Sequence, residues 1–92
     1  MKKILKATVV QGMFANENAV TLKTANGADV SLFVDADMVW ALGGIRVELI
    51  DTRGDRCLVR LPAESFEAGW WVTVMADQLL DDSQPAYWNP YK

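Results

Sequence analysis

The chain of 92 residues contains no histidine and one cysteine, Cys57. Histidine is the commonest general base and metal ligand and the usual partner of a serine or cysteine nucleophile. A single cysteine can form neither an internal disulfide bond nor a zinc site made of several thiolates, and it agrees with a reducing compartment. These absences predict a non-catalytic protein that uses no metal and no cofactor.

Long hydrophobic runs are also missing. No stretch approaches the roughly 20 apolar residues of a membrane span. The basic start of the sequence resembles the opening of a secretory signal, but Lys6, Gln11 and Asn16 interrupt the apolar region that should follow. We therefore expect no membrane association and a cytoplasmic protein.

Recognised catalytic or metal-binding motifs are absent as well. Carboxylates lie close in sequence at Asp35/Asp37, Glu64/Glu67 and Asp81/Asp82. Their spacing matches no calcium loop, and helix capping or solvation accounts for them. An enzyme acting through Asp35 and Asp37, or through Cys57, is the third hypothesis for function, and it requires a concave pocket around those residues.

The composition that remains, 51% hydrophobic and 23% charged, is typical of a globular protein of one domain. Apolar and β-branched residues alternate with polar ones along most of the chain, which predicts strands. Asn26-Gly27 predicts a type I′ hairpin turn, and Pro62 is expected to end a strand. Short helical turns are expected within 35–44 and 76–80. The strands are expected at 4–10, 20–23, 30–34, 45–50, 56–61 and 70–75.

These elements predict a mostly β fold, a small antiparallel barrel or sandwich of five to six strands with one or two short helical turns. We expect one β domain over residues 1–82, followed by an aromatic, proline-containing tail at 83–92. No internal repeat with a convincing period is evident. From Gly44 onward the order of strand, turn, strand, loop, strand and helical turn resembles the Src-homology-3-like small β-barrels. This resemblance implies a fold and no functional residues.

The strands carry more apolar residues than one core needs. The side chains expected to face inward, with Cys57 in the same phase, are Val20, Leu22, Val30, Leu32, Val34, Ile45, Val47, Leu49, Val59, Leu61, Val72 and Val74. A second apolar set lies in the opposite phase, which should be polar in a half-exposed sheet: Phe33, Ile50, Leu58, Trp71 and Met75. Something must cover this surplus.

Two explanations of the surplus stay open. Either the tail, with Tyr87, Trp88 and Tyr91, folds back over the domain, or the surplus, with or without the tail, meets another chain. A homodimer that exchanges tails satisfies both. Large exposed aromatic patches mark interfaces. We therefore expect an adaptor, inhibitor or accessory subunit that docks a protein partner. Its expected binding residues are Trp71, Met75, Leu58, Phe33, Tyr87, Trp88 and Tyr91.

The alternative function is nucleic-acid binding. Small barrels often bind strands through basic grooves, and Arg46, Arg56 and Arg60, with Arg53, are expected on one outward face. The sequence pI of about 4.7 lies far below the basic range of nucleic-acid domains, and Glu48 interrupts the basic strip. Protein interaction is therefore the preferred hypothesis.

Overall fold

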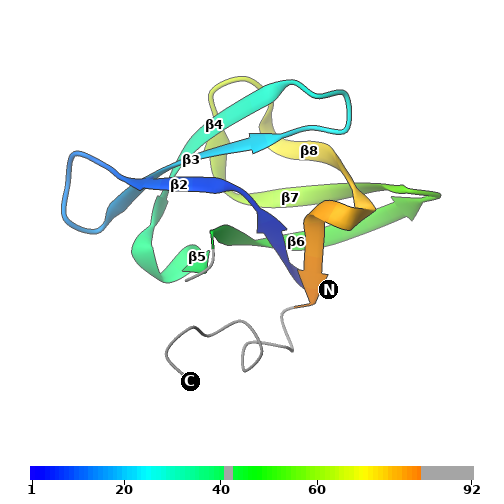
Figure 1. The fold of residues 1–92 in the computed structure, drawn as a ribbon, viewed down its shortest axis with the longest axis horizontal. Helices are drawn as coiled ribbons and strands as arrows, with labels where there is room; N and C mark the ends of the chain where they lie inside the picture. The colour runs from blue at the N-terminus through cyan, green and yellow to red at the C-terminus, as the bar shows by residue number, and fades with distance from the viewer. Residues whose placement is uncertain (41–42, 82–92) are drawn as a thin grey trace.

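The computed structural model describes residues 1–40 and 43–81. The strands form two antiparallel sheets that pack into one compact body (Figure 1). One sheet has the order β8-β7-β6-β1-β9, with β5 also paired to β6, and the other has the order β2-β3-β4. The elements are β1 (Lys2–Lys6), β2 (Thr8–Gln11), β3 (Glu17–Lys23), β4 (Asp29–Asp35), η1 (Ala36–Met38), β5 (Val39–Trp40), β6 (Gly44–Arg53), β7 (Arg56–Ser65), β8 (Gly69–Met75), η2 (Ala76–Gln78) and β9 (Leu79–Asp81).

The structure confirms the mostly β, antiparallel fold and both short helical turns, which are 3-10 helices. It has more strands than the five or six expected. The segment 4–10 is divided at Ala7 into β1 and β2, which join different sheets. Each 3-10 turn is followed directly by a very short strand, β5 or β9. None of the helical segments in 1–40 and 43–81 is long and apolar enough to cross a membrane.

The core contains the inward-facing residues that alternation predicts, except that Leu49 is only partly buried. Ile4 and Leu5 of β1 are also buried, although they were not expected in the core. Consecutive strand residues point to opposite faces. Both faces of β1 are therefore covered, and β1 lies between β6 and β9 in the sheet.

An internal twofold relationship connects the two halves of the chain. Val39 of β5 pairs with Ile45 of β6. The residue 40 positions after Val39 is Leu79, and the residue 40 positions before Ile45 is Leu5. Leu79 and Leu5 are paired in the same way, and this pair joins β9 to β1. Leu5 and Ile45 are themselves paired, so the pseudo-twofold axis passes between β1 and β6 at this point.

The same relationship extends to the other strands. β4 and η1, at 29–35 and 36–38, correspond to β8 and η2, at 69–75 and 76–78. The pair Val20–Leu32 between β3 and β4 corresponds to Val59–Val72 between β7 and β8, with an offset of 39 for β3 and 40 for β4. The expectation of no repeat was therefore wrong. Its sequence signal is short: Val34-Asp35-Ala36-Asp37 corresponds to Val74-Met75-Ala76-Asp77.

Pro62 lies within β7 and does not end a strand as expected. The pairing of β7 with β6 stops at Arg60, and its pairing with β8 shifts between Arg60 and Ser65. Proline lacks an N–H and is tolerated at such an irregularity, where the ladder requires no donor from it.

The hairpin at Asn26-Gly27 is confirmed, but its turn is not type I′. Gly27 has a φ of 84°, whereas no other kind of residue in the described chain has a positive φ. The Gly27 N–H donates to the Thr24 carbonyl and the Thr24 N–H to the Ala28 carbonyl, each over 2.9 Å. This is a three-residue loop in which a type I turn precedes a left-handed glycine. This turn therefore needs one residue with a positive φ, Gly27, whereas the predicted type I′ turn needs two.

Candidate interaction surface

The apolar side chains of the second phase remain at the surface. Trp71 is 50% and Phe33 45% exposed, Ile50 is also exposed, and Leu58 and Met75 are half-buried. The predicted tail, with Tyr87, Trp88 and Tyr91, lies outside the described residues. Sequence reasoning missed further exposed apolar side chains, namely Val10, Met13, Phe14, Met38, Phe66 and Trp70.

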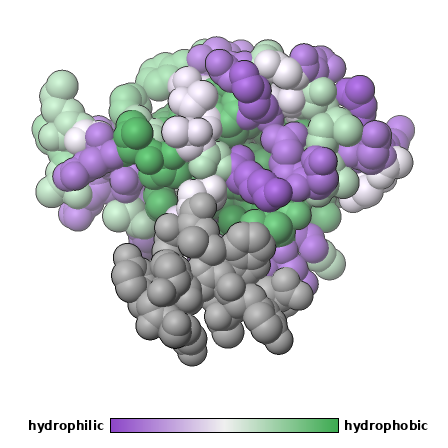
Figure 2. All heavy atoms as spheres, in the orientation of Figure 1, coloured by the Kyte–Doolittle hydropathy of each residue, from purple (hydrophilic) through white to green (hydrophobic). Residues whose placement is uncertain are grey.

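Two of the missed residues lie at the tip of the β2–β3 hairpin. Met13 is 88% and Phe14 67% exposed. The hairpin projects from one side of the body, and hydrophobic and hydrophilic residues lie side by side over it (Figures 1 and 2). Large apolar side chains at a projecting tip add little to the core and are available for contacts.

The turn between β7 and β8 is fixed against β4. The Phe66 N–H donates to the Ser31 carbonyl over 2.9 Å, and the Ser31 N–H donates to Glu67 Oε1 over 2.7 Å. The rings of Phe33 and Phe66 meet edge to face with 5.7 Å between their centroids. The geometry favours attraction between the rings, so the turn presents an ordered aromatic pair.

Arg60 lies against two tryptophans. Its guanidinium carbon is 5.1 Å from the ring centroid of Trp70 and 5.9 Å from that of Trp71. Both distances are within the range of cation–π attraction. Arg60 is paired with Trp71 on β8 and with Glu48 on β6, so the sheet register fixes this cluster.

Two open grooves adjoin beside this cluster. The Arg46 groove, of about 480 Å³, is lined among others by Lys2, Arg46 and Arg60. The Phe14 groove, of about 450 Å³, is lined among others by Phe14 and Phe33. Met38 and Pro62 belong to the walls of both. We call the two grooves together the trough.

The charges of the trough differ along its length. At the Arg46 end, neither Lys2 nor Arg46 has an ion-pair partner among the described residues. Glu48 at this end accepts a 2.5 Å hydrogen bond from the amino terminus of Met1. This bond lowers the pKa of the Glu48 carboxyl below its ordinary value, and the charges of the amino terminus and Lys2 act in the same direction. Asp37 and Glu48 line this groove as well, so it carries charges of both signs.

The pseudo-twofold axis relates the Arg46 groove to a third groove, the Lys6 groove, of about 470 Å³. The equivalent lining residues are Lys6 and Arg46, Ala7 and Val47, Thr8 and Glu48, Thr21 and Arg60, Leu22 and Leu61, Lys23 and Pro62, and Gln78 and Met38. The two grooves therefore share these equivalent lining positions, of which only Leu22 and Leu61 carry the same residue.

Three of the exposed apolar residues have polar equivalents in the other half. Thr73 corresponds to Phe33, Gln78 to Met38 and Ser31 to Trp71. Because the same backbone position accepts a polar residue, the fold itself does not require an apolar side chain there.

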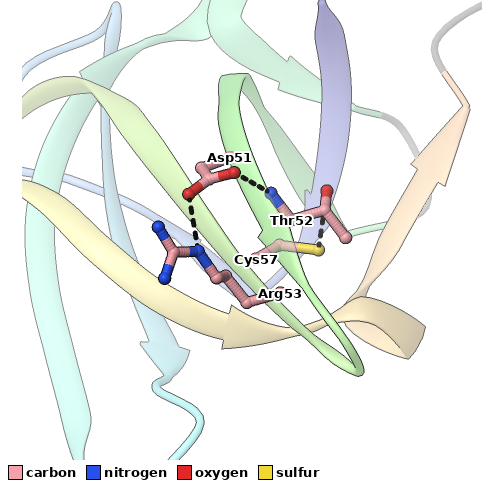
Figure 3. Close-up of polar contacts among 4 residues, drawn as sticks. All are labelled: Asp51, Thr52, Arg53 and Cys57. Atoms are coloured by element: carbon pink, nitrogen blue, oxygen red, sulfur yellow. Dashed lines mark hydrogen bonds and ion pairs between the residues drawn. The ribbon is translucent and has the colours of Figure 1, made fainter.

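The predicted arginine strip is only partly available. Arg56 and Arg60 lie outward on β7, as expected. Arg56 Nη1 donates to Asn26 Oδ1 over 3.4 Å, and Arg53 Nε donates to Asp51 Oδ2 over 3.2 Å (Figure 3). Asp51 also accepts from the Thr52 N–H over 2.9 Å. Two of the four arginines are therefore already engaged by neighbours.

The enzyme hypothesis requires a pocket around Asp35 and Asp37 or around Cys57. Asp35 lines the Phe14 groove and Asp37 the Arg46 groove, whereas Cys57 lines neither of them. Cys57 is buried at 4% exposure, as predicted, and its sulfur lies 3.9 Å from Thr52 Oγ1 (Figure 3). Asp35 makes no side-chain capping bond to η1, so of the two expected explanations, capping and solvation, capping does not apply to it. Within 1–40 and 43–81 no group of three or more acidic or cysteine side chains could hold a metal ion.

No known protein family, curated protein or solved structure matches the chain significantly.

Proposed function

We propose that this protein is a non-catalytic interaction module that docks an extended protein segment in the trough. One observation carries the proposal: Phe33, Met38 and Trp71 are exposed where the equivalent positions of the other half hold Thr73, Gln78 and Ser31. Exposed aromatic residues beside an arginine are typical of the energetically dominant part of an interface. The mechanism would be bridging or masking of a partner surface.

The trough indicates the chemistry of the segment. Phe14, Phe33 and Met38 suit an aromatic or aliphatic anchor, whereas Lys2 and Arg46 suit a carboxylate. A bound carboxylate gains more from charge-assisted bonds than a neutral group does. We therefore propose a partner peptide in which acidic residues lie near an aromatic residue.

The test is selection of a random peptide library on the immobilised full chain. We expect enrichment of peptides with an aromatic residue near Asp or Glu. The double variant Phe33→Thr/Met38→Gln copies the residues of the equivalent positions, and it should lose most of the binding. Val10→Thr removes an exposed apolar side chain from β2, outside the trough walls, and serves as the matched control.

Two results would contradict the proposal. One is equal enrichment on the double variant and on the unchanged chain. The other is binding that is lost when Lys6 and Thr21 of the equivalent groove are replaced by alanine, which would place the docking site in the other half of the molecule.

Nucleic-acid binding is the second candidate, favoured by the contact of Arg60 with Trp70 and Trp71. Stacking surfaces beside a cation are typical of single-strand binding. Affinity for a mixed-sequence single-stranded oligonucleotide should then fall steeply with salt. The resemblance to Src-homology-3-like barrels, in the order β6, β7, β8 and η2, suits either function and selects neither.

A further inference from the structure

We infer that the trough is the docking place of this chain's own C-terminal segment, residues 82–92, in the same molecule. The inference rests on the proposed function, because it names an occupant of the proposed site. The segment has the chemistry that the trough selects: Asp82 at its start, then the aromatic residues Tyr87, Trp88 and Tyr91.

The described chain ends close to the trough. Leu79 on β9 pairs with Leu5, Leu5 with Ile45 and Ile45 with Val39, so these residues form one row across four adjacent strands. With neighbouring strands about 4.8 Å apart, Val39 lies about 14 Å from Leu79. Met38, in the shared wall of the trough, directly precedes Val39.

The segment is long enough to reach the site. Trp88 follows Leu79 by nine residues, and nine extended residues span at most about 30 Å. This is about twice the separation across the sheet. The segment can therefore follow the surface and still place its aromatic residues at Met38.

The order of chemical groups also agrees. The row that contains Leu80 continues through Ile4 to Arg46, so the cationic end of the trough lies two strands away from the end of β9. Asp82 would meet the cations first, and the aromatic residues would come to Phe33 and Met38 afterwards. An attached ligand has a high effective concentration, so weak contacts suffice to hold it at the site.

The test compares the backbone amide NMR spectra of the full chain and its Tyr87→Ala/Trp88→Ala/Tyr91→Ala variant. We expect shifts at Met38, Phe33 and Arg46, and none at Lys6 and Thr21 of the equivalent groove. Unchanged signals at the trough would overturn the inference. The proposed function would survive that result if the Phe33→Thr/Met38→Gln variant still failed to bind the selected peptides.

A spin label distinguishes the chain's own segment from that of a second copy. Lys92→Cys introduces a reactive thiol while Cys57 stays buried. The label should broaden the trough signals of the molecule that carries it. In a mixture of ¹⁵N chain without label and ordinary chain with label, the signals should remain sharp. Broadening in this mixture would overturn the intramolecular form and assign the trough to the segment of another molecule.

Discussion

Gln78 and Met38 end the two 3-10 turns at equivalent positions, but Gln78 also ties its turn to a neighbouring strand. Its Oε1 accepts from the Met75 N–H over 2.7 Å, and its Nε2 donates to the Lys23 carbonyl over 2.8 Å. A thioether has no N–H to donate. Met38 therefore cannot form the hydrogen bond that Gln78 Nε2 donates, which we call the clasp. The Met38 side chain instead belongs to the walls of both grooves of the trough.

Gln78→Met should lower the free energy of unfolding by about 1 kcal/mol, because a typical hydrogen bond contributes about 0.5–1.5 kcal/mol and Nε2 is exposed. Urea denaturation followed by tryptophan fluorescence measures the change. Gln11→Met, the same replacement at the exposed end of β2, is the control. Equal losses in both variants would show that the clasp contributes nothing.

Leu5→Ala and Ile45→Ala should destabilise the protein by similar amounts, about 2–5 kcal/mol each. Both side chains are fully buried and face each other across the pseudo-twofold axis. Thermal unfolding of the two variants, measured beside Val10→Ala, gives the comparison. A loss confined to one of the two would show that the halves do not share one core.

Acidification should weaken the link between the amino terminus and Glu48. The hydrogen bond from the amino terminus lowers the pKa of Glu48 in the folded state, so its stabilising contribution is present above the ordinary pKa. It is lost as the pH falls through the folded value. NMR titration of the Glu48 side chain should show a midpoint below the ordinary value for a glutamate carboxyl, and acetylation of the amino terminus should raise it.

The Cys57 thiol should react with an aromatic disulfide reagent only when the chain opens, because it is buried at 4% exposure. The reaction rate should rise with urea in parallel with unfolding. Thr52→Val should leave the protection intact, since the hydroxyl contact of 3.9 Å is weak. A native-state rate equal to that of free cysteine would contradict the burial.

Alternation was sufficient to predict the hairpins and most of the core, since period two is the direct geometry of a strand. It failed for the internal repeat, because the offset changes from 40 to 39 between β4 and β3 and few residues are identical in the two halves. Within the candidate surface it identified Phe33 and Trp71. Alternation could not identify Phe14, Met38 and Phe66, because they lie outside strands. Met38 and Pro62 line the same grooves only because tertiary structure brings them together.

The exchange of short strands has a consequence for the origin of the protein. β5 of the first half completes the sheet beside β6 of the second, and β9 of the second half completes it beside β1 of the first. Neither half alone satisfies its own edges. Duplication and fusion of a shorter self-associating ancestor would leave this interlocked arrangement. Such an origin would also leave the two halves free to differ in side chains, as Phe33 and Thr73 or Met38 and Gln78 do.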